Sequence, residues 1–181
     1  DWLMVSLTDG YCGLAMAQTA ENLARKYEIS REEQDAFALR SQQLAAAAYD
    51  AGRLQEEIVP IELKSRKGST FFERDDHMRP DSTLEGLAKL SAAFSKNGCV
   101  TAGNASGIVD GAAAILLASE RAVKTHGLKP LGRLTHWATV GVEPSLMGMG
   151  PAPATRKVLE RAGLTIADLD LIEVNEAFAA Q

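Results

Sequence analysis

The sequence predicts an α/β fold, in which a helical, loop-rich region is followed by part of a layered α/β domain. Apolar runs typical of strands occur at residues 111–118, 131–142 and 169–174. Helical segments separate them, one ending at Gly127 and one spanning residues 151–162. This order of strand, helix, strand, helix and strand favours an α/β arrangement. The hundred residues before it contain helices and one predicted hairpin.

Two helices are predicted near the N-terminus. Residues 19–27 form a short amphipathic segment. Ser30 and Glu33 have the spacing of a capping box, and only good helix formers follow as far as Asp50. Gly52 is placed to end this helix in a left-handed conformation.

A hairpin and a third helix are predicted next. Residues 58–63 alternate and contain a proline, which indicates an edge strand, and residues 65–68 form a turn before a strand at 70–73. The segment Ser82-Thr-Leu-Glu85 predicts a second capping box, with Ser82 as the cap of a helix that runs through Leu90.

In the second half of the sequence, we predict the strands and helices named above and one further helix. Pro151 begins a helix and Gly163 follows its end. Asn175 follows the last predicted strand, and residues 176–181 are expected to begin a helix. We place a domain boundary near residues 98–102, which gives a first domain at 1–98 and a second at 99–181.

Composition excludes several classes of protein. With 181 residues, 46% of them hydrophobic, the chain can bury a core. A net charge of −5 argues against a nucleic-acid-binding protein. No apolar run approaches the roughly 20 residues that span a bilayer, so no membrane segment is expected. The chain starts without Met and ends inside a predicted helix, and we expect it to be a piece of a longer protein.

The residues most often used in metal and nucleophile sites are scattered. His77, His126 and His136 lack the spaced partners of a zinc site, so no metal is expected. Cys12 and Cys99 form no disulfide framework, which indicates an intracellular protein, and neither has the sequence context of a catalytic thiol. Motif chemistry alone therefore predicts no complete active site.

Two segments still suggest function. Residues 104–111 are small and polar directly before a predicted strand, so they form either a close approach to a ligand or a tight turn. Asn175 and Glu176 follow a strand and open a predicted helix. They either face a ligand at the carboxyl edge of the sheet or simply cap the helix.

These segments resemble motifs of the thiolases, most closely the branch of 3-ketoacyl-CoA thiolases and acetyl-CoA acetyltransferases. The Asn175-Glu-Ala-Phe-Ala179 segment is similar to the family's Asn-Glu-Ala-Phe box, and residues 99–112 to its Val-Thr-Ala-Gly-Asn segment. Other matching segments follow the family's order, and they are residues 16–22, 30–35, 79–80, 83–85 and 147–153.

The resemblance implies a fold and an activity. Thiolases cleave 3-ketoacyl-CoA with CoA or condense two acyl-CoA molecules, using two cysteines and oxyanion-stabilising donors. Residues 1–98 then correspond to the family's inserted loop domain and residues 99–181 to the start of its second α/β half. Coenzyme A is a substrate, and no other cofactor is implied. The parent is expected to be a homo-oligomer, a dimer or tetramer, that is cytoplasmic in bacteria and mitochondrial or peroxisomal in eukaryotes.

The resemblance also assigns residue roles. Asn175 matches the catalytic Asn that holds a water in an oxyanion hole, and Arg79 a residue near the CoA nucleotide. Ser106 matches a residue able to bond a pantetheine amide. Leu90, Phe94 and Ala102 match the wall along the pantetheine arm, and Ala177 and Phe178 match residues that line the acyl pocket. Met16 and Met147 match apolar residues over the substrate.

Some family features are missing from these 181 residues. Cys12 and Cys99 match neither reactive cysteine, and the Gly-His-Pro histidine is absent, so the isolated chain is expected to be inactive. Ala15 and Gly86 replace a His and a Ser found in some members. The alternative is a non-catalytic module that binds CoA or assembles subunits. The intact Asn175 box argues against a sterol-carrier-type thiolase.

Overall fold

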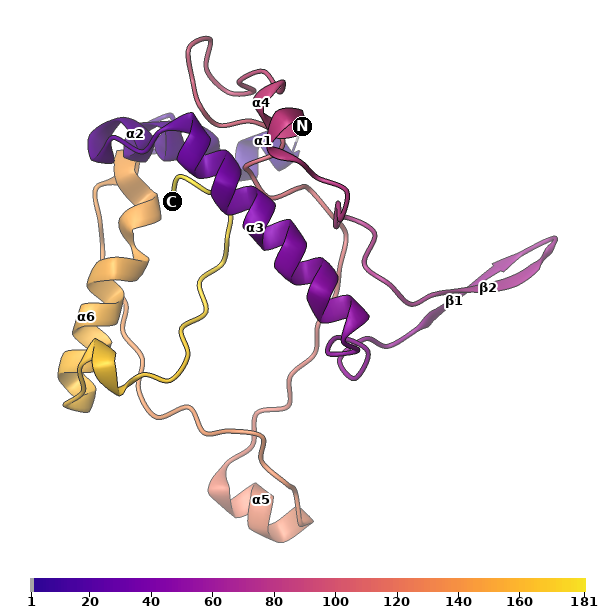
Figure 1. The fold of residues 1–181 in the computed structure, drawn as a ribbon. Coiled ribbons are helices and arrows are strands. Elements are labelled where there is room, and N and C mark those ends of the chain that lie inside the picture. The colour runs from indigo at the N-terminus through magenta and orange to yellow at the C-terminus, as the bar shows by residue number, and fades with distance from the viewer. Residues whose placement is uncertain (1) are drawn as a thin grey trace. The chain divides into compact units, whose positions relative to one another are not determined.

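A computed structural model describes residues 2–181 (Figure 1). Contacts divide the chain into two compact units, each described by itself below. Unit 1 comprises the N-terminal residues through Gly107 with Pro144–Gly148 and Asn175–Gln181, and unit 2 comprises Ile108–Glu143 and Met149–Val174. The elements are α1 (Trp2–Ser6), α2 (Met16–Tyr27), α3 (Arg31–Asp50), β1 (Ile61–Ser65), β2 (Gly68–Phe72), α4 (Leu84–Ala88), α5 (Glu120–His126), η1 (Pro144–Met149), α6 (Pro151–Ala162) and η2 (Ile166–Asp168).

The predicted capping box begins the longest helix, α3. The Ser30 hydroxyl accepts from the Glu33 N–H at 3.1 Å, and the Glu33 carboxylate accepts from the Ser30 N–H at 2.7 Å. Each bond satisfies a backbone donor that the first turn leaves free. Gly52 follows α3 with φ +72°, as predicted. The prediction of α2 is also confirmed, with an extra N-terminal turn from Met16.

The hairpin is confirmed with shifted ends. Strands β1 and β2 are antiparallel, pairing Ile61 with Phe72 and Ser65 with Gly68. Gly68 has φ +120°, which favours glycine at this tight turn. The predicted start at residue 58 is wrong, because β1 begins directly after Pro60, which has no N–H to give to a ladder.

Tyr49 near the end of α3 holds the chain that leaves the hairpin. The Asp75 N–H donates to the Tyr49 hydroxyl oxygen at 2.9 Å. The Arg74 guanidinium lies 4.8 Å from the centre of the Tyr49 ring, within the range of a cation–π contact. Burial raises the pKa of Tyr49, so its hydroxyl stays protonated at neutral pH.

Helix α4 differs from its prediction by one residue at the start and two at the end. Thr83, and not Ser82, is the cap, and its hydroxyl accepts from the Gly86 N–H at 3.1 Å. The Ser82 hydroxyl instead donates to the Arg79 carbonyl at 2.8 Å. The helix ends at Ala88, before the predicted Leu90.

The core of unit 1 brings distant segments of the chain together. Ala20 and Ala24 of α2 are buried against Val100 and Ala180, with Phe178 packed beside them. Small side chains let these backbones approach closely. A Cβ on Gly148, for example, would lie 2.6 Å from Leu23 Cδ1 and 2.7 Å from Gln181 Cγ, so glycine is required by space there.

Unit 2 contains α5, α6 and η2. Ser119 caps α5, accepting from the Ala122 N–H at 3.2 Å, and Gly127 ends it with φ +60°. Helix α6 spans Pro151–Ala162 and is followed by Gly163 with φ +67°, as predicted. Beside α6, the Arg161 guanidinium donates to the Trp137 carbonyl at 2.9 Å.

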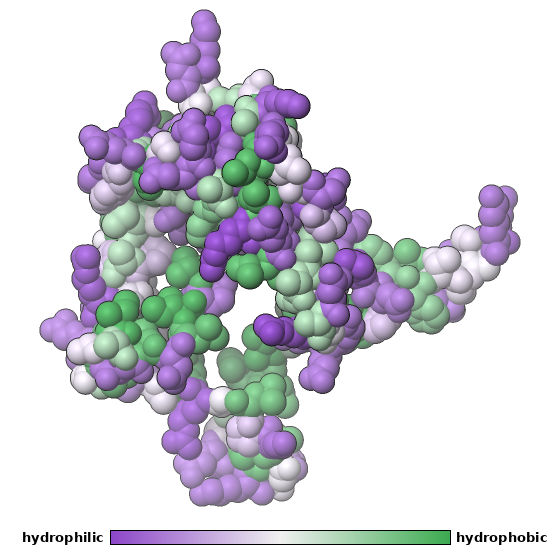
Figure 2. All heavy atoms as spheres, viewed as in Figure 1, coloured by the Kyte–Doolittle hydropathy of each residue, from purple (hydrophilic) through white to green (hydrophobic). Residues whose placement is uncertain are grey.

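The three strands predicted in unit 2 are wrong. Residues 111–118, 131–142 and 169–174 are extended chain, and within residues 2–181 the only strand ladder is β1–β2. A strand needs a neighbour for its backbone N–H and C=O groups, and the described residues supply none here. Most of their apolar side chains are exposed, as at Ile115 (86%) and Leu116 (80%), and apolar surface is visible in Figure 2.

Among residues 2–181, no helix is both long and apolar enough to cross a membrane.

Candidate active site

The C-terminal segment pairs with the segment at residues 104–106. Ala105 and Phe178 form an isolated antiparallel bridge. The Ser106 N–H donates to the Ala177 carbonyl at 2.8 Å, and the Ala179 N–H donates to the Asn104 carbonyl at 2.9 Å. The helix predicted at residues 176–181 is therefore wrong, because these backbone groups bond across to another segment. Both segments singled out in the sequence meet at this bridge.

The side chain of Asn104, beside the bridge in the chain, is buried, with 3% of the residue exposed. Its Oδ1 accepts from the Thr101 N–H at 2.8 Å. Its amide nitrogen donates to Asp35 Oδ1 at 2.9 Å and to the Cys99 carbonyl at 3.0 Å. Three bonds on one buried side chain satisfy its polar atoms and fix the backbone around it.

Glu21 holds the backbone of Cys99 and Val100, which precede Asn104, by hydrogen bonds of its own. Its carboxylate, on buried α2, accepts from the Cys99 N–H at 3.0 and 3.1 Å and from the Val100 N–H at 3.0 Å. A Cβ on Gly98 would collide with this carboxylate, so the close approach requires glycine. A buried carboxylate is tolerated where several backbone donors satisfy it.

Cys99 is unsuited to nucleophilic attack. Burial raises the pKa of its thiol, and the nearby Glu21 carboxylate raises it further. The thiolate is the reactive form, so a raised pKa lowers reactivity at neutral pH. Cys12 and Cys99 are both free cysteines. Within residues 2–181, no cluster of three or more His, Cys, Asp or Glu side chains is arranged to hold a metal ion.

All ten residues predicted for the site lie in unit 1. The bridge brings Ser106 together with Ala177 and Phe178. Asn175, which is exposed, lies two residues before Ala177 in the chain. Leu90 lies over the glycine that follows Ala102, since a Cβ on Gly103 would be 2.6 Å from Leu90 Cδ1. Phe94 follows Ala93, whose N–H donates to the Val100 carbonyl at 3.0 Å.

Three of the predicted residues come from other segments of unit 1. Arg79 is exposed, and its guanidinium donates to the carbonyls of Asp76 (3.0 Å) and Met78 (3.4 Å). Its own N–H donates to Gln42 of α3 at 2.8 Å. Met16 begins α2, and Met147 lies in η1.

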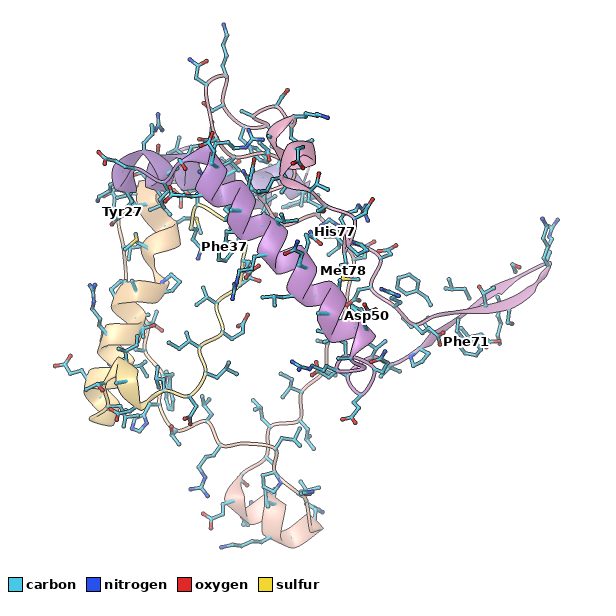
Figure 3. All side chains as sticks on the ribbon, viewed as in Figure 1. Tyr27, Phe37, Asp50, Phe71, His77 and Met78 are labelled. Carbon is cyan, nitrogen blue, oxygen red and sulfur yellow. The ribbon has the colours of Figure 1, made fainter. Side chains whose placement is uncertain are left out.

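Sequence reasoning missed the residues that support the site. His77 packs against the backbone at Gly107, where any Cβ would collide with its ring, and Figure 3 shows His77 and Met78 alongside α3. Glu21 and Asp35 fall within the matched segments 16–22 and 30–35, but the sequence assigns neither a role. A signal for Asp35 was available, because Arg31 lies four residues earlier and forms an ion pair with it.

Taken together, loops and a short bridge on a buried polar network form this site, within an α/β protein whose first unit holds helices α1 to α4 and the β1–β2 hairpin. Two family models match the chain in order: the thiolase N-terminal domain over residues 1–121 and the thiolase C-terminal domain over residues 128–181. The chain therefore belongs to the thiolase family.

Curated relatives agree with this assignment. The chain is 57% identical to an acetyl-CoA acetyltransferase of Shinella zoogloeoides over 175 residues, covering 97% of this chain and 45% of the relative. It is 55% identical to a human mitochondrial 3-ketoacyl-CoA thiolase over 181 residues, covering all of this chain and 46% of the relative. The chain thus spans a little under half the length of these relatives.

Solved structures confirm the thiolase-like α/β fold. The crystal structure of human mitochondrial 3-ketoacyl-CoA thiolase matches with a TM-score of 0.95 and 54% identity, over 99% of this chain and 46% of that one. A Bacillus anthracis acetyl-CoA acetyltransferase matches with a TM-score of 0.94, 49% identity and the same coverage. A crystal structure of human mitochondrial 3-ketoacyl-CoA thiolase in complex with CoA matches with a TM-score of 0.93 and 53% identity, over 99% of this chain and 44% of that one.

Proposed function

We propose that the whole protein is an acyl-CoA acyltransferase that cleaves 3-ketoacyl-CoA with CoA, or runs the reverse condensation of two acyl-CoA molecules. The observation that carries this proposal is the bridge between Ala105 and Phe178. It joins the segment of Ser106 to the Asn175-Glu-Ala-Phe178 box, the two segments that resemble thiolase motifs. The names of the matched relatives support the same class of reaction.

In this proposal Asn175 is the catalytic residue of the chain. Its amide would orient a water against the oxyanion that develops in the transition state, without a change of charge. Exposed Asn175 is free of the bonds that hold the bridge, so its side chain is open to a ligand. Glu176 beside it accepts from the Ser41 hydroxyl of α3, which ties the start of the box to that helix.

The other matched residues are proposed to bind substrate. Ser106 would bond a pantetheine amide, with Leu90, Phe94 and Ala102 along the same arm. Arg79 would lie near the CoA nucleotide, since an exposed guanidinium suits phosphate. Ala177 and Phe178 would line the acyl pocket, and Met16 and Met147 would lie over the substrate.

Substitution of Asn175 in the whole protein tests the catalytic role. Asn175→Ala is expected to lower kcat roughly 10²-fold, the usual effect of one lost oxyanion donor, with CoA affinity little changed. Steady-state thiolysis of 3-ketoacyl-CoA substrates of several chain lengths measures this. Asn97→Ala, the same change at an exposed loop position, is the control and should leave kcat unchanged. An Asn175→Ala enzyme with wild-type kcat would refute the role.

The alternative is a module that binds CoA or assembles subunits without catalysis. All ten proposed site residues fall in unit 1, which makes binding by residues 1–181 a fair test. We propose that this chain by itself shows no turnover, because none of its residues matches a family cysteine. Calorimetric titration with CoA, together with a thiolysis assay, separates binding from catalysis. Turnover above background would overturn the proposal.

The resemblance also supports two broader proposals. The whole protein would be a homo-oligomer, a dimer or tetramer, as expected for the family. It would be cytoplasmic in a bacterial source and mitochondrial or peroxisomal in a eukaryotic one, since the matched relatives include a mitochondrial human thiolase. Light scattering and fractionation of the source cells test these.

A further inference from the structure

A partly buried ion pair in α3 is hydrogen-bonded to residues of the proposed site. Arg31 Nε donates to Asp35 Oδ2 at 2.7 Å, and the two side chains are 22% and 5% exposed. The same guanidinium donates through Nη2 to the carbonyls of Leu87 (2.6 Å) and Leu90 (3.0 Å). The Leu87 carbonyl lies in the last turn of α4 and also accepts from the Leu90 N–H at 3.0 Å, and Leu90 follows two residues after the helix ends. Arg31 therefore fixes the position of the Leu90 segment relative to α3.

The other carboxylate oxygen of Asp35 points to the bridge. Asp35 Oδ1 accepts from the Asn104 side-chain amide at 2.9 Å. Asp35 thus receives one hydrogen bond on each oxygen, one from Arg31 and one from Asn104. Breaking a buried charged pair is costly, because the remaining charge stays unpaired. Both donors are therefore held in fixed positions.

Asn104 passes this constraint to the site through the backbone. Its carbonyl accepts from the Ala179 N–H, and two residues later the Ser106 N–H donates to the Ala177 carbonyl. A continuous series of hydrogen bonds therefore connects Leu90, Arg31, Asp35, Asn104 and the segment 177–179. It touches three parts of the proposed site: the pantetheine wall, Ser106 and the acyl pocket.

We propose that Asp35 is a positioning residue for acyl transfer, which sets the distance between the pantetheine wall at Leu90 and the bridge at Ser106 and Ala177. This inference rests on the proposed function. Asp35 touches no substrate and acts through Arg31 and Asn104. A misplacement of about 1 Å between groups that hold a substrate can cost roughly 10²-fold in rate, so a fixed spacing has catalytic value.

Asp35→Asn in the whole protein is the direct test. The variant is isosteric, but its amide nitrogen must face either Arg31 or Asn104, which are both donors. We expect the KM for CoA to rise and kcat/KM to fall by roughly 10²-fold, while circular dichroism and the thermal transition show a folded protein at the assay temperature. A merely structural role predicts unchanged KM and kcat for the folded fraction.

Two further variants keep the test decisive. Glu120→Gln makes the same chemical change in the exposed pair of Glu120 and Lys124 and should leave KM and kcat unchanged. If Asp35→Asn does not fold, Arg31→Lys decides. It keeps the charge beside Asp35 but has no planar fork for the two carbonyls, so the KM for CoA should rise several-fold. Unchanged KM in the folded Arg31→Lys enzyme would overturn the positioning role.

The outcomes also separate the two proposals. Wild-type protein without thiolysis overturns the proposed function itself. Wild-type activity with unchanged kinetic constants in folded Asp35→Asn overturns the positioning role alone. Wild-type activity with a raised KM in Asp35→Asn, and none in Glu120→Gln, supports both.

Discussion

The two compact units differ in what holds them together. Every buried residue among residues 2–181 lies in unit 1, from Ala17 in α2 to Ala180 near the C-terminus. Unit 2 also has helices with local start and stop signals, such as Ser119 at α5 and Gly163 after α6, and yet its long apolar segments are mostly exposed, with Leu131 fully so. The units therefore share local structure and differ in long-range packing.

This difference shows which forces act over which distance. A helix satisfies its backbone within one segment, so Ser119 and Gly127 suffice to delimit α5. A strand satisfies its backbone only against another strand. The bridge of unit 1 forms because residues 104–106 meet residues 177–179 across more than seventy positions of sequence.

Hydrogen exchange should show the largest difference between the units. In the 181-residue chain, the N–H groups of Cys99 and Val100 are buried on Glu21, whereas residues 115–117 are exposed extended chain. We expect the first to exchange more slowly by on the order of 10³-fold or more. Residue-resolved exchange measures this. Equal exchange in both regions would mean that unit 1 has no stable core in this chain.

A matched pair of leucine truncations should sharpen the contrast. Leu23 is 2% exposed and Leu116 is 80% exposed. Leu23→Ala removes buried methyl groups and should lower the free energy of unfolding by about 2–5 kcal/mol. Leu116→Ala should change it by less than about 0.5 kcal/mol. Urea unfolding of both variants tests this, and a large loss in Leu116→Ala would show that the segment packs after all.

The smallest expected effect concerns the pKa values of two acids in helix capping boxes, Glu33 in unit 1 and Asp168 in unit 2. The Ser30 N–H, helped by its hydroxyl, lowers the pKa of Glu33 below the ordinary 4.5. The Thr165 N–H and hydroxyl lower the pKa of Asp168 below the ordinary 3.8. In both caps the ionised carboxylate accepts the hydrogen bonds. Each acid therefore contributes to folding stability above its ordinary pKa, and this contribution is lost as the pH falls through its lowered pKa.

Carboxyl carbon titration by NMR follows both groups. Because capping bonds are local, we expect both pKa values to be lowered, in unit 1 and in unit 2 alike. Ser30→Ala and Thr165→Ala should each raise the pKa of its own partner acid and leave the other unchanged. An ordinary pKa for Asp168 together with a lowered one for Glu33 would show that η2 needs packing to form.

Local signals predicted the helices well. The capping box at Ser30 specifies the start of α3. Pro151 at the start of α6 and Gly163 after its end specify that helix within its own sequence. The cap of α4 was misplaced by one residue because Ser82 and Thr83 are both suitable caps. Only the hydrogen bond from Ser82 to the Arg79 carbonyl decides between them.

The candidate site was predicted in part. The small segment at Asn104 and the box at Asn175 were both visible in the sequence, and their resemblance to thiolase motifs gave the family. Their pairing was not visible, because residues 176–181 read equally well as a helix. The support from Asp35 was hidden for the same reason, since its partner Asn104 lies 69 positions away.

The sequence by itself determined the thiolase family and the capped helices, because motifs and caps are properties of short segments. Only the tertiary structure decided that residues 177–179 pair with residues 104–106 and that Arg31, Asp35 and Asn104 connect this pair to Leu90. The physical reason is that buried polar groups must find donors and acceptors wherever the fold brings them.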